Sequence, residues 1–166
     1  IFGFLYAPLV ITGLHHMTNA IDLELIANTA DRTTLLWPMI ALSNIAQGSA
    51  VVGVLAKNWH DERVKEVGIP AAISCYLGVT EPAMFGINIK YGFPFIAGMI
   101  GSGLAGMFSV LTNTGALSIG VGGLPGILSF PINKWGTFAI AMLIAIVVPI
   151  IMTFILGKSK RYEKQF

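Results

Sequence analysis

Glu81 is an ionisable side chain inside a long apolar stretch, and it is the strongest sign of chemistry in this sequence. An acidic side chain at the centre of a membrane helix costs about 2.5–3.5 kcal/mol on insertion scales, so something must compensate for it. Either a polar cavity lets the carboxylate accept hydrogen bonds from solute hydroxyls, or the carboxylate pairs with Lys90 or lies at the membrane interface. Thr80 and Pro82 favour the cavity, because a residue before proline is shifted away from helical geometry. We therefore expect the backbone at Glu81 to turn toward a cavity.

Asn88 and the adjacent pair His15 and His16 are further polar candidates. Asn88 can share a face with Glu81 only if the helix resumes after Pro82. Adjacent histidines point about 100° apart on a helix, and no His or Cys stands at a ligand spacing, which makes zinc improbable. A neutral imidazole both donates and accepts hydrogen bonds, so the pair suits the polar wall of a site for a hydroxylated solute. The alternative is that either histidine is satisfied by the backbone or by neighbours on its helix.

Two other features favour packing rather than chemistry. Cys75 stands among apolar neighbours without a nearby cation to stabilise a thiolate, so we expect it to be buried and unreactive. Gly98, Ser102 and Gly106, at four-residue spacing, form a small-residue face that allows close packing of helices in a membrane.

The composition indicates an integral membrane protein. Of the 166 residues 55% are hydrophobic and 11% charged, whereas soluble domains carry about 25% charged residues. Disorder and a disulfide-stapled module are excluded by the apolar content and the single cysteine. The net charge of +2 forms no basic patch, so we expect no nucleic-acid partner. The chain opens at Ile1 in an apolar run without a basic n-region, so this run is not a signal peptide, and we expect a piece of a longer transporter.

Uncharged intervals predict the membrane segments. Thr33–Ala56, Phe93–Leu111 and Trp135–Gly157 are each long enough to cross a hydrocarbon core. Gly68–Ile89 is broken by glycines and Pro82, and the stretch between Thr112 and Lys134 is crowded with glycine and proline. Irregular backbone at membrane depth is tolerated where it lines a watery cavity. Two broken segments therefore indicate a solute site and a transport function.

Basic residues near segment ends predict the orientation. The connection Lys57–Glu66 and the tail after Leu156 are basic and are expected inside, whereas the acidic Asp22–Arg32 is expected outside. These placements agree only if both broken segments re-enter and return to their own side. The segment Ile1–Ile21 can be assigned neither as a span nor as a re-entrant segment. The predicted fold class is an all-α integral membrane protein with spanning helices and re-entrant or broken hairpins.

Four motifs carry a family resemblance. They are Gly78–Gly86 (GVTEPAMFG), Gly13–His16 (GLHH), Trp37–Gly48 (WPMIALSNIAQG) and Asn88–Phe95 (NIKYGFPF). The first closely resembles the GITEP-type signature of membrane IIC domains of the phosphoenolpyruvate-dependent sugar phosphotransferase system, in its glucose superfamily. The others are similar to the sucrose and trehalose branch, with trehalose as the preferred sugar. The resemblance covers nearly the whole chain.

The resemblance implies a group translocator of the bacterial inner membrane that takes up a disaccharide as its phosphate, here trehalose as trehalose 6-phosphate. Residues 1–157 would be the C-terminal, sugar-binding half of IIC, and residues 158–166 a basic cytoplasmic tail. Implied partners are the lipid membrane, the rest of IIC, a IIB domain phosphorylated on cysteine, and a second copy in an intact homodimer. No cofactor is expected, and this half alone should be catalytically incomplete.

The resemblance also assigns roles to residues. The signature glutamate carries over to Glu81, as the catalytic residue that binds the sugar hydroxyl receiving phosphate. A histidine contact carries over to His15 or His16, and Thr80 and Asn88 are added as substrate-binding candidates, with no metal ligand. The competing class is a non-enzymatic secondary transporter, whose broken helices and midplane carboxylate look much the same. Binding of a phosphorylated IIB domain would discriminate the two.

Overall fold

Three apolar runs form long helices in the computed structural model, which describes residues 1–120 and 122–158. They are α3 (Leu36–Lys57), α7 (Phe93–Leu111) and α8 (Trp135–Gly157). Each is long and apolar enough to cross a membrane. The bounds of α7 and α8 are those predicted, and α3 begins three residues later than the predicted Thr33. The all-α membrane fold class is confirmed for the described residues.

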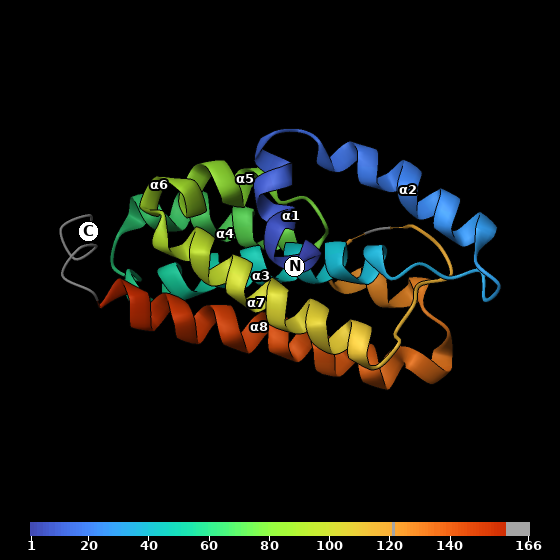
Figure 1. Cartoon of the computed structure of the whole chain (residues 1–166). Coiled ribbons are helices and arrows are strands. Elements are labelled where there is room, and N and C mark those ends of the chain that lie inside the picture. The colour runs from blue at the N-terminus through green and yellow to red at the C-terminus, as the bar shows by residue number, and fades with distance from the viewer. Residues whose placement is uncertain (121, 159–166) are drawn as a thin grey trace.

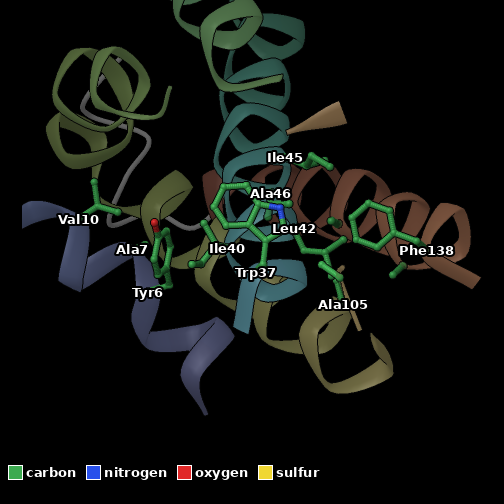
Figure 2. Packing of buried hydrophobic residues seen from close by; sticks show 14 of the residues in the cluster. Tyr6, Ala7, Val10, Trp37, Ile40, Leu42, Ile45, Ala46, Ala105 and Phe138 are labelled. Atoms are coloured by element: carbon green, nitrogen blue, oxygen red, sulfur yellow. The ribbon is translucent and has the colours of Figure 1, made fainter. Parts of the chain in front are cut away.

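The three helices pack on one another, with α3 at the centre (Figure 1). Of the most apolar window of each helix, 89% is buried in α3 but only 22% in α8. The outer surface of α8 is uniformly apolar, as a lipid-facing helix requires. Figure 2 shows Leu42 and Ile45 of α3 beside Phe138 of α8 and Ala105 of α7 in the main buried cluster.

Small residues let α1 (Phe2–Ile11) approach α7 closely. The hydroxyl of Ser102 donates to the carbonyl of Gly3, and a Cβ on Gly3 would lie 3.7 Å from the Cα of Gly106. Gly98 faces α3 instead, where a Cβ would overlap the side chain of Gln47. The predicted small-residue face therefore packs against two helices.

The first broken segment forms a helical hairpin. It comprises α4 (Glu62–Tyr76), α5 (Glu81–Ala83), a π-helical turn η1 (Met84–Asn88) and α6 (Ile89–Tyr91). Its turn is at Gly78, with φ of +104°. Helix α4 begins before the predicted Gly68, because Asp61 caps it by accepting a hydrogen bond from the Arg63 amide at 3.0 Å.

The second broken segment lies between α7 and α8 and contains two 3₁₀ helices, η2 (Leu124–Ser129) and η3 (Ile132–Lys134). At its own end of the bundle, the Lys134 ammonium donates to the Thr112 carbonyl at 3.0 Å. At the other end, the Lys57 ammonium donates to the Gly157 carbonyl. Each broken segment starts and returns at one end of the bundle (Figure 1), as the sequence predicts of re-entrant hairpins.

The segment Ile1–Ile21 is divided between two helices. Gly13, with φ of +76°, separates α1 from α2 (His15–Asn28). Figure 1 shows α2 running along the outside of the bundle. Only Thr18 and Asp22 of α2 are buried, so this helix has little apolar packing to hold it in place.

Candidate functional site

The tips of the two broken segments meet inside the bundle. A Cβ on Gly78 would lie 2.9 Å from the amide nitrogen of Gly122, and a Cβ on Gly123 would overlap the carbonyl of Tyr76. Only glycine permits this approach, because any side chain would separate the two tips. Asn44 of α3 braces the first tip by donating a hydrogen bond to the Gly78 carbonyl at 3.1 Å.

A cavity of about 230 Å³ opens beside this junction. Its walls come from α1, α2, α3 and both broken segments, and they combine aromatic, amide, imidazole and carboxylate groups. The lining residues are Tyr6, His15, His16, Asn19, Trp37, Ile40, Asn44, Gly78, Val79, Glu81, Gly120 and Gly122. A concave site with a few convergent polar groups is the usual form of a small-molecule site.

His15 and Glu81 face each other across this cavity. His15 Nε2 lies 3.7 Å from Glu81 Oε1, with 15% and 44% of the two side chains exposed. This separation is too long for a direct hydrogen bond. It suits a solute hydroxyl that donates to the carboxylate and also contacts the imidazole, since a hydroxyl can donate and accept at once.

The environment keeps His15 neutral. Burial lowers the pKa of His15 below its ordinary value, and the neighbouring His16 lowers it further, while the Glu81 carboxylate opposes the shift. The His15 and His16 rings lie 4.0 Å apart between centroids, and Tyr6 meets the His15 ring edge-on at 6.4 Å. Both histidines line the cavity, and His15 is the one paired with Glu81.

Glu81 is helical, which differs from the expectation that Pro82 would move it out of helical geometry. It is the first residue of α5, and Pro82 lies in the first turn. Proline is tolerated there because the first-turn amides have no intrahelical acceptor. The break lies upstream at Gly78, and it points the start of α5 at the cavity. In the described residues Glu81 has no ion pair with Lys90, whose ammonium lies 5.5 Å from the centre of the Tyr91 ring.

Thr80 and Asn88 do not line this cavity. Thr80 is buried at the start of α5. Asn88 is fully buried and donates to the backbone and side-chain oxygens of Gln47 at 3.1 and 2.7 Å. The intervening π-helical turn changes the angular phase, so seven-residue spacing from Glu81 does not place Asn88 on the cavity face. Their roles in substrate binding stay predictions.

Several cavity residues were not singled out from the sequence: Tyr6, Asn19, Trp37 and Asn44. A signal existed only for Asn44, an amide in the middle of an otherwise apolar spanning helix. Cys75 is fully buried in α4 against Gly48, in agreement with a packing role. No cluster of three or more potential metal ligands occurs within residues 1–120 and 122–158.

Comparison with known proteins identifies the family. The family model described as "Phosphotransferase system, EIIC" matches residues 1–103. The chain belongs to this family. It is therefore an integral protein of the bacterial inner membrane, which agrees with its three membrane-spanning candidates. The resemblance seen in the four sequence motifs is confirmed.

The relatives are named for two sugars. The chain is 57% identical over 161 residues to the trehalose-specific EIIBC component of Escherichia coli K12, covering 96% of this chain and 33% of the relative. It is 48% identical to the trehalose-specific EIIBC component of Bacillus subtilis, covering 96% and 34%, and 44% identical to the sucrose-specific EIIBC component of Pasteurella multocida, covering 99% and 35%. The chain thus spans about a third of the length of these relatives. No solved structure matches it significantly.

Proposed function

We propose that this chain is the sugar-binding half of a IIC permease domain in a protein that takes up trehalose as trehalose 6-phosphate. Membership of the EIIC family supports the transport of a sugar coupled to its phosphorylation. Trehalose is favoured over sucrose because the two trehalose-specific relatives are 57% and 48% identical, against 44% for the sucrose-specific relative.

The single observation that carries this proposal is the pairing of His15 and Glu81 across a polar cavity at the junction of the two hairpin tips. In the proposed role, the Glu81 carboxylate accepts the proton side of the sugar hydroxyl, and His15 or His16 fixes its direction. Aromatic Tyr6 and Trp37 provide apolar walls for the faces of the sugar ring. Positioning of this kind is the main catalytic contribution in phosphoryl transfer.

The phosphoryl donor lies outside this chain. A IIB domain carries phosphate on cysteine, and the names of the relatives join B and C components in one polypeptide. During transfer the S–P bond of the phosphocysteine breaks, an O–P bond to the sugar forms, and the hydroxyl proton passes to Glu81. The chain by itself would bind sugar but not phosphorylate it, since Cys75 is fully buried away from any donor.

The assembly follows from the same proposal. Residues 1–157 would form the sugar-binding half, completed by the rest of IIC and paired in a homodimer of the intact protein. Residues 158–166 would form a cytoplasmic tail, of which 159–166 lie outside the described residues.

Uptake by the full-length protein in inverted membrane vesicles tests the function. With phosphoenolpyruvate and the soluble phosphotransferase proteins, radiolabelled trehalose should be converted to trehalose 6-phosphate, and sucrose should be converted less efficiently. Recovery of unmodified trehalose after transport would favour a secondary transporter instead. A preference for sucrose would retain the mechanism and reassign the sugar.

A further inference from the structure

Asp22 is a buried carboxylate on a helix that is otherwise mostly exposed. Its side chain is 0% exposed, and Thr18 is the other buried residue of α2. Burial raises the pKa of Asp22, and hydrogen bonds to the carboxylate from Thr34 and Trp37 oppose this shift. A buried carboxylate is costly unless donors compensate for it, so its contacts explain why it is there.

Those contacts lie at the beginning of α3. Asp22 Oδ1 accepts a hydrogen bond from the Thr34 hydroxyl at 2.5 Å and another from the Trp37 amide at 3.1 Å. The Trp37 amide lies in the first turn of α3, where amides have no intrahelical acceptor. The residue at the N-cap position, Leu35, has no side-chain acceptor to offer. Asp22 of α2 therefore caps α3 from a different helix, where negative charge is also favoured by the helix dipole.

Thr34 extends this connection to a third segment. Its hydroxyl accepts from the Leu36 amide at 3.1 Å, while its backbone pairs with Ala116 through two hydrogen bonds of 2.9 Å. Ala116 begins the second broken segment, which leads to Gly122 at the cavity. One pair of side chains, Asp22 and Thr34, thus joins α2, the start of α3 and the second broken segment.

The same three elements supply most of the cavity wall. Helix α2 contributes His15, His16 and Asn19; α3 contributes Trp37, Ile40 and Asn44; and the second broken segment contributes Gly120 and Gly122. Trp37 belongs to both sets, because its amide binds Asp22 while the residue lines the cavity. Figure 2 shows Trp37 beside Tyr6 and Ile40 at this place in the core.

We infer that Asp22 is a positioning residue for the sugar site: through Thr34 and the Trp37 amide it holds α2 so that His15 faces Glu81. The inference rests on the proposed function and adds to it a residue that does not line the cavity. Because α2 is otherwise exposed, loss of this anchor frees the helix without opening the three-helix core. The loss should appear in sugar binding before it appears in folding.

Equilibrium binding of trehalose to the purified full-length protein tests this inference. Asp22→Ala removes both hydrogen bonds and should weaken binding by about tenfold or more, since hydrogen bonds to a charged group contribute about 1.5–3 kcal/mol. Asp22→Asn keeps an acceptor oxygen and should recover most of the affinity. The matched control is Glu24→Ala on the same helix, because Glu24 is exposed and bonded only to Asn28 within α2 in the described residues. Wild-type affinity in Asp22→Ala would overturn the inference.

Two further measurements separate positioning from a general loss of stability. Thr18→Cys, made in a Cys75→Ser background, reports on the seating of α2, since Thr18 is 6% exposed. Its labelling by a soluble maleimide should accelerate in Asp22→Ala, while the melting temperature of the detergent-solubilised protein changes little. Unchanged labelling together with a large fall in melting temperature would show a merely structural role.

Thr34→Val provides the second variant, because valine keeps the shape of threonine without its hydroxyl. It should weaken binding in the same direction, and the Asp22→Ala/Thr34→Val double variant should be less impaired than the sum of the single changes, as expected for one network. If Asp22→Ala does not reach the membrane, wild-type affinity in Thr34→Val refutes the inference. If the wild-type protein binds no sugar, the proposed function has failed instead.

Discussion

His15 Nε2 and Glu81 Oε1 lie 3.7 Å apart, although one residue begins α2 and the other begins α5. Each is the first residue of its helix after a glycine with positive φ, Gly13 or Gly78, has redirected the chain. The breaks therefore do more than interrupt membrane segments. They bring two titratable groups from opposite sides of a hairpin junction to the same cavity.

Glu81→Gln tests the charge of the carboxylate, because it keeps the shape and one acceptor oxygen. Loss of charge-assisted hydrogen bonding, about 1.5–3 kcal/mol, should weaken sugar binding by about tenfold to a hundredfold. Phosphorylation should fall further, because the glutamine cannot accept the hydroxyl proton. Binding and turnover of the full-length protein are the measurements. Lys90→Met is the control and should bind sugar normally, and normal values for both quantities in Glu81→Gln would exclude the proposed role.

The protonation of His15 predicts a pH dependence. Its pKa is lowered chiefly by burial and further by His16, against the opposing effect of Glu81. The neutral form therefore persists to a pH below about 6.5, where an ordinary histidine is half protonated. Trehalose affinity should be constant from about pH 8 to 6.5 and should fall below it, as the imidazolium pairs with Glu81 and competes with the sugar. His15→Gln cannot be protonated and should lose this fall, whereas His60→Gln should retain it.

Cys75→Ser should leave sugar phosphorylation intact. Cys75 is fully buried in α4, packed against Gly48 of α3, so it is inaccessible to a phosphoryl donor. Phosphorylation in vesicles, normalised to the amount of protein in the membrane, is the measurement. Loss of phosphorylation with sugar binding retained would show that this thiol takes part in transfer.

The arrangement of the hairpins predicts the exposure of two loops. His60 and Asp31 are both exposed, and they lie on connections expected to face the cytoplasm and the outside, respectively. In the Cys75→Ser background of the full-length protein, His60→Cys should be labelled by an impermeant maleimide only in inverted vesicles. Asp31→Cys should be labelled only in right-side-out vesicles, and the reverse pattern would invert the proposed orientation.

The long helices were predictable because their boundaries are local. Phe93–Leu111 and Trp135–Gly157 are uninterrupted apolar runs, and the structure retains these bounds. Glu81 and His15 were predictable as polar groups in apolar segments. The cavity wall was not, because Tyr6 and Trp37 appear in sequence as ordinary core aromatics and become neighbours of the site only through packing. The position of Asn88 depends on a π-helical turn, which has no clear pattern in the sequence.

Gly78→Ala tests whether the contact between the two hairpin tips forms the site. At φ of +104° alanine is strained, and its Cβ would lie 2.9 Å from the Gly122 amide nitrogen. The substitution should destabilise the protein by at least about 1 kcal/mol. It should also weaken sugar binding, because separating the tips moves the short stretch that leads to Glu81. Gly136→Ala is the matched control, since a Cβ there meets nothing within 4 Å and alanine is the better helix former. Melting temperature and trehalose affinity of the full-length protein should fall together in Gly78→Ala and remain unchanged or rise in Gly136→Ala; two unaltered values in Gly78→Ala would mean that the tips are apart in the working protein.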